Sequence, residues 1–316
     1  MFRIYCDALQ EGIWFKNLDG HFVNAKLAVF PNRQEDQQRE GLAGVLRYDR
    51  PDIILKDDDR IIFVLERTIE VPSGHNVGQR FGRLVAAAEE HVPVVYFGPY
   101  AAHKHGGITS GPRYMNLRLF SSLQNLSIAY NTAVTTINWP VDQNYEILKV
   151  SGFDSRVRLY LWLFFQYYDA HGFNGLTEYM AHSSFQQEQY SEQRNFALTQ
   201  IRNPEQYDAP PTSVSILARA QFEKAYGPLP SCRSHISQIV FYNVGMQNVR
   251  SDPYAGMAAL YYFLYCNQNT SLILYFPNIS FTTWRQLDTT TKTYRMYKNF
   301  SEGIVFQTQL VWKENV

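Results

Sequence analysis

Residues 50–71, RPDIILKDDDRIIFVLERTIEV, constrain the fold more than any other stretch of the chain. Two short runs rich in Ile, Leu and Val flank the acidic sequence DDD. Branched apolar residues favour strands, and consecutive aspartates are typical of turns. We therefore predict two strands, over 51–56 and 60–71, joined as a hairpin.

One face of the second predicted strand changes from apolar to polar residues along its length. Alternate residues of a strand point to opposite sides of the sheet. One face of this strand is mostly apolar along its whole length. The other face begins with Ile62 and Val64 and then turns polar. It ends with Glu66, Thr68 and Glu70, as is typical of a strand that lines a cleft.

The turn predicts which side chains oppose each other across the hairpin. With a three-residue loop over 58–60, Asp57 lies opposite Ile61, and Asp52 lies opposite Glu66. Opposed residues have Cβ atoms roughly 5 Å apart. Two carboxylates that close repel unless a cation lies between them, and a hard divalent cation such as Mg²⁺ fits oxygen ligands. A one-residue slip would instead place the two acids on opposite faces.

The elements that follow the hairpin indicate an α/β (α+β) core. PSGHN at 72–76 breaks the second strand. Residues 77–91 place Val77 and Phe81 on one helical face, with later apolar residues at the same spacing. Residues 92–97, VPVVYF, read as another strand. The predicted order is therefore strand, strand, helix, strand.

The rest of the chain predicts mixed α and β elements without repeats. The expected elements are a buried aromatic helix over 155–169, a loop over 203–215, a helix over 253–266 that begins at Ser251-Asp252-Pro253, and a strand over 272–276. We place a soft domain boundary near residue 150. Residues 1–150 would form the core with the hairpin, and residues 151–316 a second region, either separate or continuous with the core.

The composition limits the classes of protein to which the chain can belong. The chain has 316 residues, of which 45% are hydrophobic, enough to bury a sizeable core. Lys+Arg 29 balances Asp+Glu 29, so net charge neither indicates nor excludes a nucleic-acid partner. The three cysteines form no CxxC pair, and the N-terminus lacks the apolar run of a signal peptide. The longest apolar run, LYLWLFF, is too short for a membrane span. We expect a cytoplasmic, intracellular protein of prokaryotic type.

The hairpin and the helix after it resemble a known family. Pro51-Asp52 is followed by Glu66-Arg67-Thr68 in the second strand. The next helix carries Gln79 and Arg83 and leads into a strand. This block, about residues 50–98, resembles the core of the PD-(D/E)xK nucleases, the restriction endonucleases and their relatives. The resemblance implies a mixed β-sheet flanked by helices, with additional α and β elements in the C-terminal half.

The resemblance also implies a centre for phosphodiester hydrolysis. Its catalytic residues would be Asp52, Glu66, Thr68 and Gln79. Mg²⁺, with Mn²⁺ as a substitute, would be held by Asp52, Glu66 and Glu70. Such a metal activates water and stabilises the charge on the phosphate. An upstream acid, Glu35 or Glu40, is the alternative to Glu70.

Thr68 departs from the family pattern, which usually has Lys two residues after the acid. That Lys usually orients the attacking water and offsets phosphate charge, whereas Thr68 carries no charge. A cation from elsewhere would then replace it, and the candidates are Lys56, Arg80, Arg83 and Lys104. Lys56 is the weakest of these because it lies about 13 Å along the strand from Asp52, at ~3.3 Å per residue.

Several side chains are candidates for contacts with nucleic acid. Those near the predicted centre are His75, Asn76, Arg80, Arg83 and Lys104. Farther along the chain, the candidates for phosphate contacts are Arg194, Arg202, Arg219, Lys224, Arg233 and Arg250. A solvated surface role is the alternative for each. His103 and His105 flank Lys104, but two histidines without a cysteine are a weak zinc pattern.

Three functions follow from this resemblance. The first is a Mg²⁺-dependent type II restriction endonuclease that cleaves double-stranded DNA at a specific sequence, as a homodimer with two-fold symmetry. The second is another nuclease of the same superfamily, acting in repair, on RNA, or on modified or structured DNA. The third is a non-catalytic nucleic-acid-binding module on a degenerate nuclease fold, suggested by Thr68. Motifs of P-loop enzymes, nucleophile-elbow hydrolases and HExxH metalloproteases are absent from the sequence.

Overall fold

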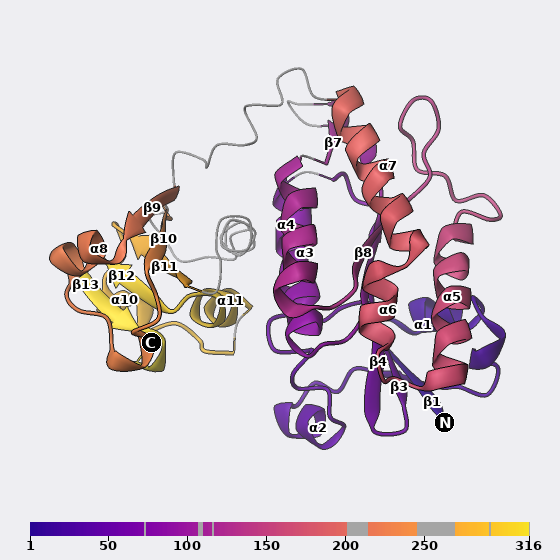
Figure 1. The fold of residues 1–316 in the computed structure, drawn as a ribbon, viewed down its shortest axis with the longest axis horizontal. Helices are drawn as coiled ribbons and strands as arrows, with labels where there is room; N and C mark the ends of the chain where they lie inside the picture. Colours follow the sequence, from indigo (N-terminus) through magenta and orange to yellow (C-terminus); the bar gives the residue numbers. More distant parts are fainter. Residues whose placement is uncertain are drawn as a thin grey trace. The chain divides into compact units, whose positions relative to one another are not determined.

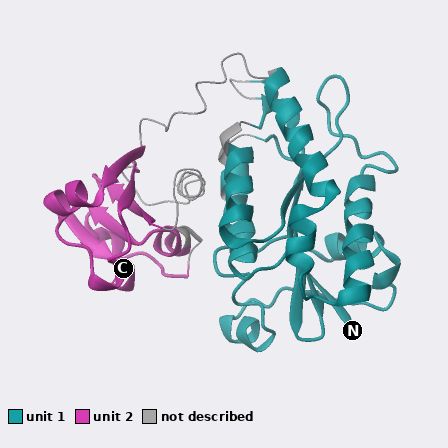
Figure 2. Ribbon diagram, viewed as in Figure 1, with its two compact units in different colours: residues 1–202 teal, residues 203–316 magenta. Residues whose placement is uncertain are grey.

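The chain divides into two compact units, Met1–Arg202 and Asn203–Val316 (Figure 2). The computed structural model describes all residues except 73, 107–109, 116, 201–213, 245–268, 291 and 316. The expected boundary near residue 150 lies inside the first unit. The physical reason is that the helices between 155 and 200 pack on the first unit's sheet and share its core.

The first unit is built on a six-stranded mixed sheet of order β2-β1-β3-β4-β5-β8. Its strands are β1 (Phe2–Cys6), β2 (Lys26–Val29), β3 (Ile53–Asp57), β4 (Arg60–Arg67), β5 (Val94–Gly98) and β8 (Val134–Asn138). The strands β1, β3 and β4 are antiparallel neighbours, whereas β5 runs parallel to both β4 and β8. The predicted order of strand, strand, helix, strand is observed in β3, β4, α3 and β5.

Helices cover both faces of this sheet (Figure 1). The helices of this unit are α1 (Leu9–Lys16), α2 (Gln34–Arg39), α3 (Gly74–Glu89), α4 (Leu117–Tyr130), α5 (Ser155–His171), α6 (Leu176–His182) and α7 (Ser184–Gln200), with a short 3-10 helix at Gly20–Phe22. The helix α2 has no buried residue. The helices α3 and α4 lie together on one side, and α5 lies on the other. A small hairpin, β6 (Ala101–Lys104) with β7 (Gly111–Tyr114), follows β5.

Aromatic side chains join the sheet to the helices of one face. The ring of Phe63 on β4 lies 5.8 Å from Phe15 on α1 and 5.8 Å from Phe164 on α5. The predicted buried aromatic helix is therefore confirmed as α5, whose Tyr160, Phe164 and Phe165 are buried. This packing accounts for the buried, apolar middle of β4.

The β3–β4 hairpin has the predicted register near the acids but a different turn. Ile53 pairs with Leu65, so the preceding Asp52 is set opposite Glu66, as predicted. At the turn, Asp57 pairs with Arg60, and the prediction that it pairs with Ile61 is wrong. The loop has two residues instead of three, and a bulge after Leu55 restores the predicted register.

The second unit holds a five-stranded sheet of order β13-β12-β11-β10-β9. Its elements are β9 (Val214–Ala218), α8 (Arg219–Tyr226), β10 (Gln238–Asn243), β11 (Thr270–Phe276), α10 (Phe281–Trp284), α11 (Lys292–Phe300), β12 (Gly303–Phe306) and β13 (Gln309–Trp312), with 3-10 helices at Ser231–Arg233 and Lys313–Asn315. Apolar clusters cover both faces, one around Trp284 and one around Phe222. Mixed α and β structure in this half is confirmed.

Sequence predictions for the second half have mixed outcomes. The strand expected over 272–276 lies within β11. The helix expected over 253–266 and residues 203–213 of the expected loop lie outside the described residues. Val214 and Ser215, at the end of that expected loop, begin β9 instead. None of the described helices has the length and apolar character needed to cross a membrane.

Candidate active site

The two predicted acids meet where β3 begins and β4 ends. Asp52 directly precedes β3, and Glu66 is the penultimate residue of β4. The Arg67 backbone N–H donates a hydrogen bond to Asp52 Oδ2 at 2.5 Å. This bond fixes the Asp52 carboxylate beside the strand that carries Glu66. The pairing of Ile53 with Leu65 thus brings two acids from adjacent strands together.

Helix α3 places two guanidinium groups on these carboxylates. Arg83 Nη1 donates to both oxygens of Glu66, at 2.6 and 2.7 Å, and lies 4.0 Å from Asp52 Oδ1. Arg83 Nε donates to Asp49 Oδ2 at 2.8 Å. Arg80 Nε lies 3.1 Å from Glu66 Oε1, and its Nη2 lies 3.1 Å from Glu70 Oε2. We call Asp49, Asp52, Glu66, Glu70, Arg80 and Arg83 the acid–arginine cluster.

The cluster forms because α3 is packed tightly against the sheet. Val77 and Phe81, on the predicted apolar face, are buried. Arg80 and Arg83 are three residues apart and so share one helical face. Their side chains are only 15% and 19% exposed. The expected solvated or phosphate-facing role of Arg83 is thus replaced, in this structure, by contacts with the acids.

Burial dominates the electrostatics of the acids. Glu66 is fully buried, and this raises the pKa of its carboxyl, whereas the charge of Arg83 opposes the rise. Burial also raises the pKa of Asp52, although the Arg67 N–H and Arg83 favour its charged form. The charged form of Glu66 therefore depends on the direct hydrogen bonds from Arg83, because solvent does not reach the carboxylate.

Glu11 on α1 is a further acid near Asp52 that sequence reasoning missed. Burial, and then the charge of Asp52, raise the pKa of Glu11. Arg67 opposes this shift, and its guanidinium lies 4.5 Å above the Trp14 ring. No sequence pattern pairs α1 with the hairpin, because the contact depends on the tertiary packing of α1. Asp49 was also missed, although it lies three residues before Asp52.

The upstream acids expected to support the centre lie elsewhere. Glu40 accepts hydrogen bonds from Arg3 at 2.9 Å and from Tyr5 at 2.6 Å. Glu35 is exposed in the first turn of α2. Lys56, one of the candidate replacement cations, donates to the Glu40 carbonyl at 2.6 Å. Among the candidates, the α3 arginines are those that contact the acids, and Glu70 joins the cluster through Arg80.

Thr68 has a local structural role. It is buried, and its Oγ1 accepts a hydrogen bond from the Glu70 N–H at 3.1 Å. Its own N–H donates to the Phe97 carbonyl at 2.9 Å, which extends the pairing of β4 with β5. Nothing in these contacts replaces the charge of the expected Lys. The positively charged groups that contact Glu66 are Arg80 and Arg83.

The structure places the remaining predicted contact residues as follows. Asn76 Nδ2 donates to the Val71 carbonyl at 3.0 Å, and Lys104 ends β6. The side chains of His75 and Gln79 lie outside the described residues. Arg233 is buried in ion pairs with Glu302 and Glu314, and Arg219 pairs with Glu223. Arg194 is exposed, Lys224 lies in the last turn of α8, and Arg202 and Arg250 lie outside the described residues.

The cluster has the donor types that a hard divalent cation requires. Carboxylate oxygens of Asp52 and Glu66 approach the same nitrogen, Arg83 Nη1. A positive charge therefore already lies at the point where these acids converge. Mg²⁺ prefers such oxygen ligands, so Asp52 and Glu66 fit this ion, provided that Arg83 moves away as the ion binds.

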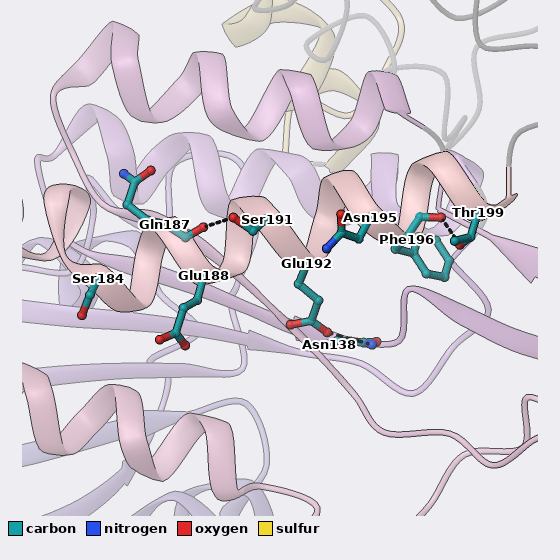
Figure 3. A pocket seen from close by; sticks show the side chains of 9 residues that line it. All are labelled: Asn138, Ser184, Gln187, Glu188, Ser191, Glu192, Asn195, Phe196 and Thr199. Carbon is teal, nitrogen blue, oxygen red and sulfur yellow. Dashed lines mark hydrogen bonds between the residues drawn. The ribbon is translucent and has the colours of Figure 1, made fainter.

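A groove of about 850 Å³ lies along α7, separate from the acid–arginine cluster (Figure 3). Its lining residues are Asn138, Ser184, Gln187, Glu188, Ser191, Glu192, Asn195, Phe196 and Thr199. Asn138 Nδ2 donates to Glu192 Oε1 at 3.3 Å across it. Among the lining residues that the structure describes, the charged ones are the acids Glu188 and Glu192, which disfavour a nucleic-acid phosphate there.

Comparison with known proteins finds no matching family model, and no similar curated protein or solved structure.

Proposed function

We propose that the chain is a Mg²⁺-dependent endonuclease that hydrolyses phosphodiester bonds of double-stranded DNA, with a type II restriction specificity. The observation that carries this proposal is the convergence of Asp52 and Glu66, from adjacent strands, on Arg83 Nη1. The resemblance of residues 50–98 to the PD-(D/E)xK core supports the same assignment. Both arguments depend on the β3–β4 hairpin, which is central in the sheet.

In this proposal, residues of the chain form a binding site for a metal cation. Asp52 and Glu66 would hold Mg²⁺, and Mn²⁺ would substitute for it. When bound, the ion supplies a Lewis acid for water and for the phosphate oxygens. The Arg67 N–H orients Asp52, and the burial of Glu66 removes water that would compete for its oxygens.

Arg80 and Arg83 take the role of the missing Lys in this proposal. Both guanidinium groups neutralise carboxylates in the structure. When a metal neutralises those acids, the positive charge of the arginines is no longer compensated. A planar guanidinium is suited to a phosphate, because it donates two parallel hydrogen bonds. The arginines would then bind the phosphate whose ester bond is cleaved.

The test is cleavage of supercoiled and linear plasmid in Mg²⁺ and in EDTA. We expect discrete bands in Mg²⁺ only. Asp52→Asn and Glu66→Gln should each reduce cleavage by at least ~100-fold, about 2.7 kcal/mol of barrier. Glu40→Gln is the matched control, because Glu40 pairs with Arg3 and Tyr5 outside the cluster. Full activity of Asp52→Asn would exclude the proposed centre.

The pattern of products separates the restriction type from its relatives. Discrete fragments indicate sequence specificity, whereas a smear indicates a repair-type or structure-directed nuclease. Cleavage of both strands of a palindrome calls for two copies related by a two-fold axis. We therefore propose a homodimer on DNA. Light scattering with and without an oligonucleotide that contains the cleavage site would test it.

A non-catalytic nucleic-acid-binding module is the second candidate function. The observation that favours it is that Glu66 is fully buried and both its oxygens accept from Arg83. A module of this kind would keep the ion pairs in place of a metal. This second function predicts that the protein binds DNA in gel-shift assays and does not cleave it with any divalent metal. It also predicts that calorimetry detects no Mg²⁺ binding that requires Asp52.

A further inference from the structure

A second cluster of ligand-type side chains lies at the small β6–β7 hairpin. His105 Nε2 is 2.8 Å from Glu146 Oε2, and His103 Nδ1 is 3.6 Å from Glu146 Oε1. The two imidazole rings are 4.7 Å apart between centroids. One donor atom from each of the three side chains lies within 4.8 Å of the other two. The three groups therefore already face a common point.

The backbone explains why the two histidines share a side. His103 lies on β6, and the chain leaves the strand after Lys104. Residues two apart on an extended chain point to the same side, so His103 and His105 point one way and Lys104 the other. Pairing of His103 with Pro112 on β7 holds this edge of the hairpin in place.

Glu146 is held in place by a tight loop after β8. The Glu146 N–H donates to Asp142 Oδ1 at 2.9 Å, and the Glu146 carbonyl accepts from the Asp142 N–H at 3.0 Å. Tyr145 adopts a left-handed φ of 64°, which turns the chain at this point. The Tyr145 carbonyl then accepts from the His103 N–H at 2.9 Å. These hydrogen bonds thus hold the backbone of Glu146 next to the strand that carries His103.

One donor atom in this cluster lacks a hydrogen-bond partner among the described residues. His103 Nδ1 is buried and has none within hydrogen-bond distance. Its nearest charged neighbour is Glu146 Oε1, at 3.6 Å. A buried nitrogen without a partner is unfavourable, and a metal ion bound to it would remove that penalty.

We propose that His103, His105 and Glu146 form a binding site for a transition-metal ion of the Zn²⁺ class. Around a tetrahedral ion with bonds of about 2.0–2.1 Å, the donors lie roughly 3.3 Å apart. Each histidine nitrogen lies near this distance from one of the two Glu146 oxygens, at 2.8 Å for His105 and 3.6 Å for His103. One donor atom from each residue lies within 4.8 Å of the others, so the three side chains need to move closer together to bind one ion. Two imidazoles and one carboxylate favour Zn²⁺, Co²⁺ or Ni²⁺ over Mg²⁺, which prefers oxygen ligands alone.

This site is distinct from the acid–arginine cluster and does not depend on the proposed nuclease activity. Three protein ligands leave a fourth position for water or another small ligand. The ligands come from segments on either side of β8 and α4 in the sequence, so the ion would clip the β6–β7 hairpin to the 142–146 loop. Binding to the folded state alone would also raise the stability of the first unit.

The test uses tag-free, full-length protein that has been treated with EDTA and desalted. Zn²⁺ is titrated in competition with a chromophoric chelator, and Co²⁺ binding is followed by its visible absorption. We expect one Zn²⁺ per chain and a higher midpoint of thermal unfolding with Zn²⁺ than with EDTA. His103→Asn and Glu146→Gln should each weaken Zn²⁺ binding by at least ~10-fold. His182→Ala, an exposed histidine elsewhere, is the matched control and should leave it unchanged.

Two results would overturn the site. One is wild-type protein without a stoichiometric Zn²⁺ site and without Co²⁺ absorption bands. The other is a His103→Asn/Glu146→Gln double variant that binds Zn²⁺ as tightly as wild type. The first result concerns wild-type protein alone, so it would overturn the proposal even if a variant failed to fold.

Discussion

At the scale of single residues, Arg83 balances charges that water cannot reach. It donates to Glu66 and Asp49, and Glu66 is fully buried. Arg83→Met should lower the free energy of unfolding by about 3–5 kcal/mol, because it leaves a buried charge without its partner. Urea unfolding monitored by circular dichroism measures this loss.

Two variants give this measurement its controls. Arg47→Met removes an exposed ion pair with Glu89 and Glu90, so it should cost less than about 1 kcal/mol. Adding Glu66→Gln to Arg83→Met should recover part of the loss, because the buried charge is removed as well. Equal effects of Arg83→Met and Arg47→Met would show that Glu66 is not charged in the folded protein.

His21 predicts a pH dependence of stability. Burial lowers the pKa of this imidazole, but hydrogen bonds with Asp19 and Asp169 raise it more, and the net shift is upward. A raised folded pKa stabilises the protein below the unfolded value of about 6.5, and this stabilisation is lost as pH rises through the folded pKa. Asp169→Asn should therefore cost up to about 1 kcal/mol at pH 5.5, since the pair is partly exposed, and much less at pH 8.5. An equal loss at both pH values would contradict the assignment.

The pairing of Asp52 with Glu66 was predictable from sequence, whereas Asp49 was missed and Arg83 was one of four candidate cations. Asp52 and Glu66 lie on one hairpin, so strand alternation and a short turn are enough to oppose them. Arg83 and Glu11 reach the same place from two helices, and their directions depend on how each helix packs on the sheet. Thr68 illustrates the same limit, since its hydroxyl is used by the Glu70 N–H.

At the scale of elements, hairpin turns decide register. Both the β3–β4 and the β12–β13 hairpins have two-residue loops, and each starts with a non-glycine residue in the left-handed region: Asp58 at φ 47° and Gln307 at φ 53°. Three aspartates in a row indicate a turn but not its length. The predicted loop was one residue too long, but the bulge after Leu55 shifts the register by one residue. The predicted pairing of Asp52 with Glu66 is therefore observed.

The β12–β13 turn supplies a test of this strain. Gln307→Gly should stabilise the second unit by about 0.5–1 kcal/mol, because glycine adopts a positive φ without steric conflict. Thr308→Gly is the matched control: Thr308 lies outside the left-handed region, so glycine there adds only unfolded-state entropy and should destabilise. Thermal unfolding of the two variants compares them directly. Stabilisation by both, or by neither, would contradict the argument.

At the scale of the whole molecule, each apolar cluster described above belongs to one of the two units. Aromatic residues of α1, α5 and β4 form one core, and Trp284 and Phe222 lie in clusters of the other unit. The sequence has no low-complexity linker, so nothing in it marks the division between residues 202 and 203. The aromatic helix at 155–171 was assigned to the second region because its target, the sheet face near Phe63, is nearly a hundred positions away in sequence.

Separate cores predict that the first unit folds alone. Residues 1–202, expressed as a fragment, should unfold cooperatively and keep the near-ultraviolet signal of its packed aromatic residues. The fragment should also bind Zn²⁺ as the full chain does, because His103, His105 and Glu146 all belong to it. A fragment with far-ultraviolet but no near-ultraviolet signal would show that the first unit needs the second for fixed packing.

The position of Arg83 Nη1 between Asp52 and Glu66 makes this guanidinium a tethered competitor for any metal ion at the same acids. Because it is part of the chain, its effective concentration is set by α3 and does not change with dilution or dialysis. If a metal ion binds both carboxylates as proposed, Arg83 would have to leave them, and binding would be an exchange reaction. Affinity for Mg²⁺ should therefore be lower than two converging carboxylates alone would give, and chelators should leave the hairpin folded.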